Sequence, residues 1–135
     1  MVAVRSGSVP AATAPDAAAA ALRTFFNIAA VWRLDPDQAQ RLLGVQRSTF
    51  YDWKAGRFPA RLAADTLERL SYVFGIWSAL QLLLPIPERA NAWIRRPNTA
   101  PLFGGGTALE RMLAGQVSDL FVVRQYLDAQ RGGRT

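Results

Sequence analysis

The stretch from Asp35 to Arg57 constrains the fold of this chain more than any other. An aspartate before a proline favours the start of a helix, because the carboxylate caps free backbone N–H groups and the proline needs none at that position. Gly44 tolerates the left-handed conformation that ends a helix. A second helix is predicted over 46–54, closed by residues 55–57. The segment therefore predicts two short helices joined by a tight turn.

The second of these helices has two different faces. An apolar seam of Val45, Phe50 and Trp53 is expected to anchor it in the core. Polar and charged side chains make up the other face: Gln46, Arg47, Ser48, Tyr51, Asp52 and Lys54. Helical hairpins with a glycine turn are common in proteins of many kinds. The short linker, the hydrogen-bonding start of the second helix and its buried anchor favour a DNA-binding helix-turn-helix.

The segment resembles Xre/Cro-type helix-turn-helix proteins. Leu43-Gly44-Val45, Arg47-Ser48-Thr49, Trp53 and Gly56 carry this resemblance, and Gln40 departs from it where the family favours alanine. By position, the resemblance implies that four side chains face DNA bases: Gln46, Arg47, Ser48 and Asp52. Arg47 suits the O6 and N7 atoms of guanine, and Asp52 suits the N4 amine of cytosine. Tyr51, Lys54 and Arg57 are expected to contact phosphates.

The composition agrees with such a partner but does not identify it. The chain has 16 Lys+Arg against 10 Asp+Glu, and Lys54 is its one lysine. Arginine donates paired hydrogen bonds to phosphate and guanine, although a high-GC genome explains its abundance equally well. There is no cysteine or histidine, which excludes disulfides, thiolate nucleophiles and histidine-based catalysis or zinc sites. No carboxylate pair stands out either, so we predict a binding protein without enzymatic activity or a cofactor.

Helical periodicity and caps extend over most of the chain, so the expected fold class is all-α. Residues 1–15 are expected to be a flexible tail without a signal peptide, and no apolar run reaches the roughly 18 residues of a membrane span. A cytoplasmic protein is predicted. Asp16 is expected to cap a helix to about Trp32, and Pro59 to open a long helix to about Leu83.

Further elements are predicted after this long helix. Pro87 is expected to start a helix that ends near Arg95, and a loop over 99–106 follows. Thr107 and Glu110 have the spacing of a capping box. Ser118 is expected to cap a last helix to about Gln130. In the long helix, four apolar residues are expected to form either part of the monomer core or a dimer seam: Phe74, Ile76, Trp77 and Leu80.

The C-terminal third resembles the toxin-binding domain of the Xre/MbcA/ParS antitoxins. Trp93, Pro97-Asn98, Leu109-Glu110, Gly115, Leu127 and Gly132-Gly133 carry the resemblance over residues 88–133. Ala108 stands where the family often has proline, and the glycine triplet 104–106 is richer than usual. The predicted division is a helix-turn-helix domain over 16–86 and a toxin-binding domain over 87–135.

The resemblance implies an antitoxin of a RES-domain toxin, which consumes NAD⁺ or transfers ADP-ribose. It implies a C-terminal segment that covers the toxin's active site, with these candidates: Arg124, Tyr126, Arg131, Gly132, Gly133 and Arg134. Arginines suit a pocket built for phosphates, and glycines let the backbone enter a narrow cleft. A frayed basic tail is the alternative for the last five residues, and Trp93 is expected in the core.

The same resemblance implies autorepression by a dimer, within a homodimer or a larger toxin–antitoxin assembly. The expected operator is an inverted repeat with half-sites about 10 bp apart. The alternative is a plain transcriptional repressor whose C-terminal part only dimerises.

Overall fold

A computed structural model describes residues 15–132. All helices and turns in that range assemble without any β-strand, so the predicted all-α fold is confirmed. The expected flexible tail falls outside the described residues except for Pro15, where the first helix begins. None of the helices in the described part of the chain has the length and apolarity that crossing a membrane requires.

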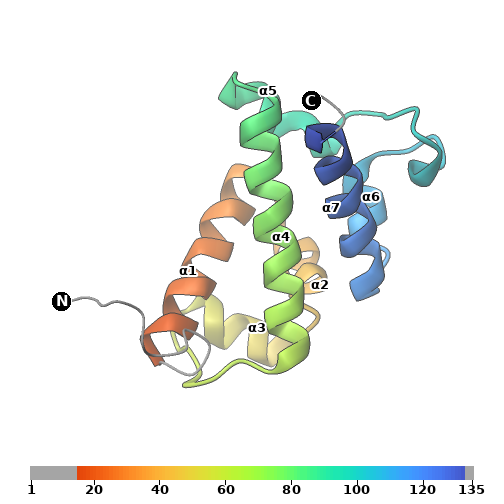
Figure 1. Ribbon diagram of the computed structural model, residues 1–135. Helices are drawn as coiled ribbons and strands as arrows, with labels where there is room; N and C mark the ends of the chain where they lie inside the picture. Colours follow the sequence, from red (N-terminus) through yellow and green to blue (C-terminus); the bar gives the residue numbers. More distant parts are fainter. Residues whose placement is uncertain (1–14, 133–135) are drawn as a thin grey trace.

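A central helix organises the molecule (Figure 1). This helix, α4 (Ala64–Leu83), lies between α1 (Pro15–Val31) on one side and α7 (Val117–Gly132) on the other. It packs most extensively against α7. The short helices α2 (Pro36–Leu43) and α3 (Arg47–Lys54) lie toward one end of α4, and α2 contacts it directly. The helix-turn-helix and the C-terminal part therefore share one supporting helix.

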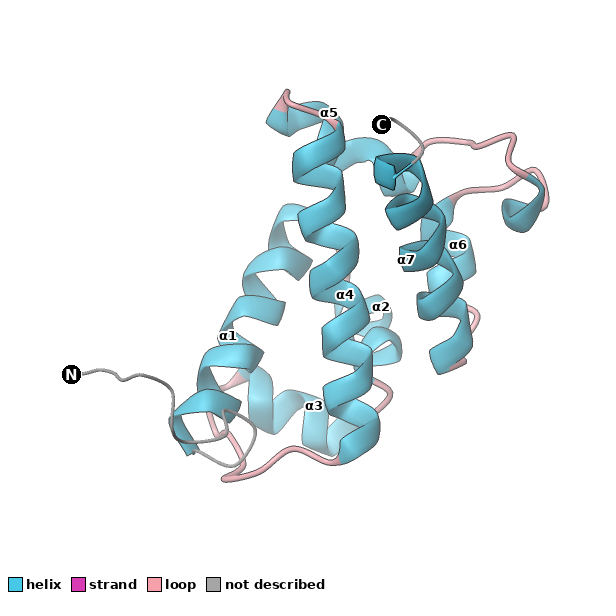
Figure 2. Cartoon of the chain, viewed as in Figure 1, coloured by secondary structure: helices cyan, strands magenta, loops and turns pink. Residues whose placement is uncertain are grey.

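The remaining elements connect α4 to α7 by a longer route. After α4 come α5 (Pro87–Ala92) and the 3₁₀ turn η2 (Trp93–Arg95). A loop then leaves the body of the protein and holds a second 3₁₀ turn, η3 (Pro101–Phe103), before α6 (Ala108–Met112) (Figure 2). The η3 turn was not predicted within the loop.

One continuous apolar core joins these elements. The largest fully buried side chains come from α1, α2, α3, α4, η2, α6 and α7 and the turn after α1: Trp32, Phe25, Phe50, Leu22, Leu42, Leu43, Ile76, Leu80, Ile94, Met112, Leu120 and Leu127. Ile76 and Leu80, which were candidates for a dimer seam, belong to this core. Phe74 and Trp77 are half-buried against it, as is Trp93, which was expected in the core.

The long helix begins later than expected. It starts at Ala64 rather than Pro59, and the residue before it has an extended backbone. A proline is compatible with a first helical turn, but the residues from Pro59 to Ala63 are not helical here. Phe58 and Leu62 both pack against the core from the non-helical stretch. The non-helical stretch thus brings Leu62 to the core together with Phe58.

Two predicted caps are shifted by one or two residues. Asp16 lies inside the first turn of α1 instead of preceding it. Ser118 lies inside α7, which begins at Val117. The backbone N–H of Gln116 donates instead to Asp119 Oδ2 at 3.0 Å. A carboxylate is a stronger acceptor than a hydroxyl and is favoured by the positive end of the helix dipole, so Asp119 takes the capping role.

Candidate functional site

The turn between α2 and α3 has the geometry that its sequence predicts. Asp35 and Gln38 form a reciprocal capping box at the start of α2. Gly44 ends the helix with φ 68° and ψ 31°, in the left-handed region. Gln40, the residue that departs from the Xre/Cro pattern, donates from Nε2 to the carbonyl of Val45 at 3.1 Å. The larger side chain thus bridges the turn, while Ala39 beside it is buried.

Helix α3 is anchored by its apolar face, as predicted. Phe50 is 1% exposed and Trp53 is 9% exposed. The ring of Phe50 lies 5.7 Å from that of Phe26 on α1. Every predicted DNA contact is exposed to solvent: Gln46, Arg47, Ser48, Tyr51, Asp52, Lys54 and Arg57. The residues predicted to read DNA are therefore brought together on one open surface, named here the α3 face.

Tyr51 organises the cations of the α3 face. The guanidinium carbon of Arg47 lies 5.1 Å from the centre of its ring, and Nζ of Lys54 lies 5.9 Å from it. Cations are attracted to the negative face of an aromatic ring. The two cations are therefore held close to α3, and no acid in the described part of the chain pairs with them.

Asp52 and Arg57 occupy each other in the free protein. Nη2 and Nε of Arg57 donate to Asp52 Oδ1 at 2.8 and 3.2 Å, and the backbone N–H of Arg57 donates to the carbonyl of Asp52. Both side chains are more than half exposed. Exposed ion pairs contribute about 1 kcal/mol or less. This pair closes the end of α3 and is weak enough to exchange partners.

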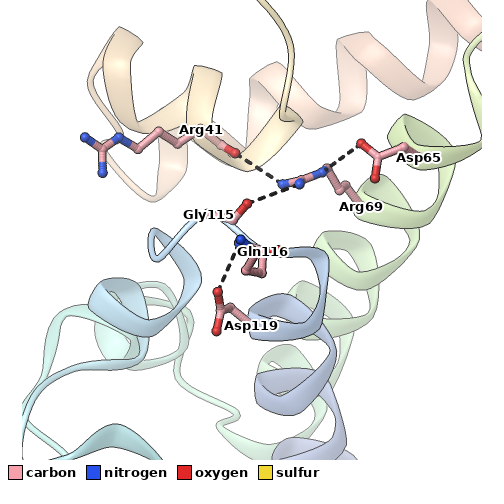
Figure 3. Close-up of polar contacts among 6 residues, drawn as sticks. All are labelled: Arg41, Asp65, Arg69, Gly115, Gln116 and Asp119. Atoms are coloured by element: carbon pink, nitrogen blue, oxygen red, sulfur yellow. Dashed lines mark hydrogen bonds and ion pairs between the residues drawn. The ribbon is translucent and has the colours of Figure 1, made fainter.

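Arg69 on α4 joins the turn of the helix-turn-helix to the C-terminal part (Figure 3). Its Nε lies 3.0 Å from Asp65, and its other nitrogens donate to the carbonyls of Arg41 and Gly115 at 3.5 and 3.2 Å. A Cβ on Gly44 would lie 2.5 Å from Arg69 Nε. Gly44 is thus required for its backbone angle and also for this close approach. The sequence reasoning missed Arg69, since its i,i+4 spacing from Asp65 is also typical of a solvated pair.

A polar network holds the C-terminal part around Asp119. Arg111 donates from Nε to Asp119 Oδ1 at 2.9 Å and from Nη1 to the carbonyl of Leu102 at 3.0 Å. Asp119 also accepts from Gln116, and its side chain is 12% exposed. The pair therefore ties the loop before α6 to the start of α7. No group of three or more acidic side chains in the described chain lies close enough together to hold a metal ion.

The predicted toxin contacts on α7 have intramolecular partners. Arg124 donates to the carbonyl of Ser71 at 3.2 Å and pairs with Asp128 at 3.5 Å. It lies against Gly75, where any Cβ would collide with it. A glycine inside a helix is a sequence signal of such a close approach, and it was overlooked.

Tyr126 lies within an aromatic group on the same helix. Its ring is stacked on Trp93, with centres 6.3 Å apart, and meets Phe103 edge-on at 5.4 Å. Arg131 is exposed at the end of α7, and Gly132 ends the helix. Gly133 and Arg134 lie outside the described residues. The three side chains thus lie in different environments along α7: Arg124 against the middle of α4, Tyr126 in the aromatic group and Arg131 exposed near the end of the helix.

Two family models match consecutive parts of this chain. Residues 11–75 match the antitoxin Xre-like helix-turn-helix domain. Residues 79–133 match the antitoxin Xre/MbcA/ParS C-terminal toxin-binding domain. The chain is also 54% identical, over 115 residues, to a protein of Sinorhizobium fredii (strain NBRC 101917 / NGR234) described as "Uncharacterized protein y4oB". That similarity covers 84% of this chain and 86% of the relative. With a helix-turn-helix whose polar face is exposed and a toxin-binding region packed on the same central helix, this chain belongs to the Xre/MbcA/ParS antitoxin family.

Proposed function

We propose that this antitoxin inhibits a RES-domain toxin by covering its active site, and represses its own operon by binding operator DNA as a dimer. The observation that carries the DNA-binding part is the α3 face, which is polar and open while Phe50 and Trp53 hold the helix in the core. The proposed units are a DNA-binding domain over 16–86 and a toxin-binding domain over 87–135, acting in the cytoplasm.

On DNA, α3 enters the major groove. Arg47 donates to a guanine, with Gln46 and Ser48 beside it at the start of the helix, where base contacts are made. Lys54 and Tyr51 reach phosphates. Asp52 accepts from a cytosine amine when Arg57 leaves it for a phosphate, an exchange that the exposed pair permits at small cost.

Arg47→Ala tests the base-reading role. Affinity for the chain's own promoter fragment is expected to fall by about 1–3 kcal/mol, while affinity for random DNA changes little. Fluorescence anisotropy on both DNAs at matched salt measures this, because phosphate contacts make all affinities salt-dependent. Arg89→Ala, which removes an exposed arginine on α5, is the matched control. Equal weakening on the two DNAs would show that Arg47 only contacts phosphate.

On the toxin, we assign the main inhibitory contact to the end of α7 and the residues after it. Arg131 is exposed there, and the chain continues through Gly132 and Gly133 to Arg134. An arginine beside glycines suits a cleft that binds a dinucleotide's phosphates. Arg124 and Tyr126 lie further back and support the same surface through their contacts with α4 and Trp93.

Truncation after Gln130 tests this assignment. The shortened antitoxin is expected to bind DNA normally but to release the NAD⁺ consumption of the toxin encoded beside it, measured as NAD⁺ loss with purified proteins. Arg131→Ala with Arg134→Ala is expected to give a partial release. Arg5→Ala, at the opposite end of the chain, is the control. If the truncated protein inhibits fully, the helices carry the interface and the active-site covering is wrong.

The competing function is a plain repressor whose C-terminal part only dimerises. Co-purification of the tagged antitoxin with the product of the neighbouring gene distinguishes the two. A stable complex that loses NAD⁺ consumption supports the antitoxin of a RES toxin. A homodimer that binds the promoter and leaves the neighbouring protein unbound supports the plain repressor.

A further inference from the structure

A groove of about 470 Å³ lies beside the buried side of α3, and Lys54 belongs both to its lining and to the α3 face. Its walls come from α1, from the turn and first residues of α2, from α3 and from the segment that follows α3. The apolar part includes Phe26, Phe50, Trp53 and Phe58. This volume and this mainly apolar lining, with four aromatic residues, are typical of sites for small organic molecules.

The charges of the groove all have one sign. Arg23 and Lys54 are its charged lining residues, and its lining contains no carboxylate. Both side chains are exposed, and neither forms an ion pair with any described residue. The guanidinium of Arg23 lies 5.3 Å from the centre of the Phe58 ring, which holds it at the groove without neutralising it. The groove therefore combines an aromatic floor with two available cations.

We propose that this groove binds a small organic anion, a carboxylate carried on a flat apolar body. The body packs against the half-buried rings of Phe26 and Phe58, where it removes apolar surface from water. The carboxylate is placed at Arg23 and Lys54. The two positive charges attract it and repel an equally apolar cation. This site goes beyond the proposed function, which needs no small ligand.

The position of the groove gives such a ligand a route to the DNA-binding surface. Phe50 and Trp53 form part of the groove and are also the two residues that hold α3 in the core. Lys54 lines the groove and contacts Tyr51 on the α3 face. A bound anion therefore withdraws Lys54 from DNA and changes the support of the helix, so the ligand weakens DNA binding.

The probe for this site is 2-naphthoate, compared with 2-naphthylmethylamine, which has a similar body and the opposite charge at neutral pH. Calorimetric titration of the full chain is expected to show one naphthoate per chain and roughly tenfold weaker binding of the amine. Equal affinities of the two probes, or binding of several naphthoates without saturation, would overturn the proposal.

Two pairs of variants locate the site. Ala30 is exposed and lines the groove, so Ala30→Trp is expected to fill it and to abolish naphthoate binding. Ala20→Trp, at an exposed position of the same helix outside the groove, is expected to bind normally. Arg23→Gln is expected to weaken naphthoate about 3- to 5-fold, as for loss of one exposed ion pair. Arg89→Gln is its control. Unchanged binding to Ala30→Trp overturns the assignment.

A site-specific readout completes the test. Naphthoate is expected to shift the indole N–H resonance of Trp53 in two-dimensional NMR, assigned with Trp53→Phe, and to leave that of Trp93 unchanged. A shift at Trp93 alone overturns the assignment. A more than tenfold gain in affinity on removing residues 1–14 would mean that the chain's own segment covers the groove, which also overturns it. None of these outcomes depends on the toxin or the operator.

Discussion

The charged side chains of α3 and those of the α6–α7 region are used in opposite ways. On α3, Arg47 and Lys54 are exposed and lie near the ring of Tyr51, and neither pairs with an acid among residues 15–132. Around α6 and α7, Arg111 and Asp119 bind each other and nearby backbone groups inside the fold. Arginines therefore occur in both regions, and residue type alone does not distinguish an exposed cation from one that holds the fold together. The neighbours of each side chain make that distinction.

Asp119→Ala is expected to have the largest effect, a loss of about 3 kcal/mol in unfolding free energy. Its carboxylate is nearly buried, and its loss leaves Arg111 and the Gln116 N–H without their acceptor. Urea denaturation measures the loss. Asp37→Ala removes an acid from a pair with Arg41 in which both side chains are more than half exposed, and is expected to cost about 0.5 kcal/mol or less. Similar losses in the two variants would remove the distinction between inward and outward charges.

Arg69→Met is expected to lower the unfolding free energy by about 2 kcal/mol. The side chain is 12% exposed and has three acceptors, so its removal leaves the carbonyls of Arg41 and Gly115 without this donor. Thermal and urea unfolding measure the change, with Arg89→Met as the exposed control. A loss no greater than that of the control would mean that the two regions are not joined through Arg69.

Arg124→Met sharpens the comparison within α7. We expect a loss of about 1 kcal/mol, because methionine keeps the apolar stem over Gly75 but cannot donate to Ser71. Urea denaturation is measured beside toxin affinity. Unchanged stability with lost toxin binding would place Arg124 among the outward charges and contradict the supporting role that we assign to it.

The smallest effect is expected at Tyr72, whose hydroxyl donates to Glu68 at 2.7 Å. This hydrogen bond to a carboxylate, which also repels a phenolate, raises the pKa of Tyr72 above its ordinary value. A raised pKa in the folded state means a stabilising contribution that is present below the unfolded pKa and is lost as pH rises through the folded pKa. Glu68→Gln is expected to lower the pKa of Tyr72, as followed by its phenolate absorbance against a Tyr72→Phe blank. An unchanged pKa would contradict the contact with Glu68.

The sequence predicted those features that depend on neighbouring residues. The turn at Gly44, the capping box of Thr107 and Glu110, and the buried faces of Phe50 and Trp53 all follow from local patterns, and all are confirmed. The start of α4 was wrong because Phe58 and Leu62 are drawn to a core built by distant elements. The helix preference of neighbouring residues does not indicate where a core built by distant elements lies.

The candidate site divides in the same way. The α3 face followed from helical periodicity, since its residues differ from Phe50 and Trp53 only by their position on one helix. Arg69 and Arg124 each have one partner far along the chain, 46 and 53 residues away respectively. Helical spacing relates residues three or four positions apart and does not predict contacts at such separations. Gly75, in the middle of a long helix, was the one visible sign that a side chain from elsewhere packs there.

The contact of Arg69 with Gly115 also has a consequence for the order in which the protein is made. Chains emerge from the ribosome with the N-terminal part first. Arg69 then already has Asp65 and the carbonyl of Arg41 within reach, while Gly115 follows 46 residues later. The hydrogen bond between Arg69 and the Gly115 carbonyl can therefore form only after the α6–α7 turn has been synthesised. The link between α2 and the α6–α7 turn through Arg69 therefore forms only in the last part of synthesis, when α7 is also made.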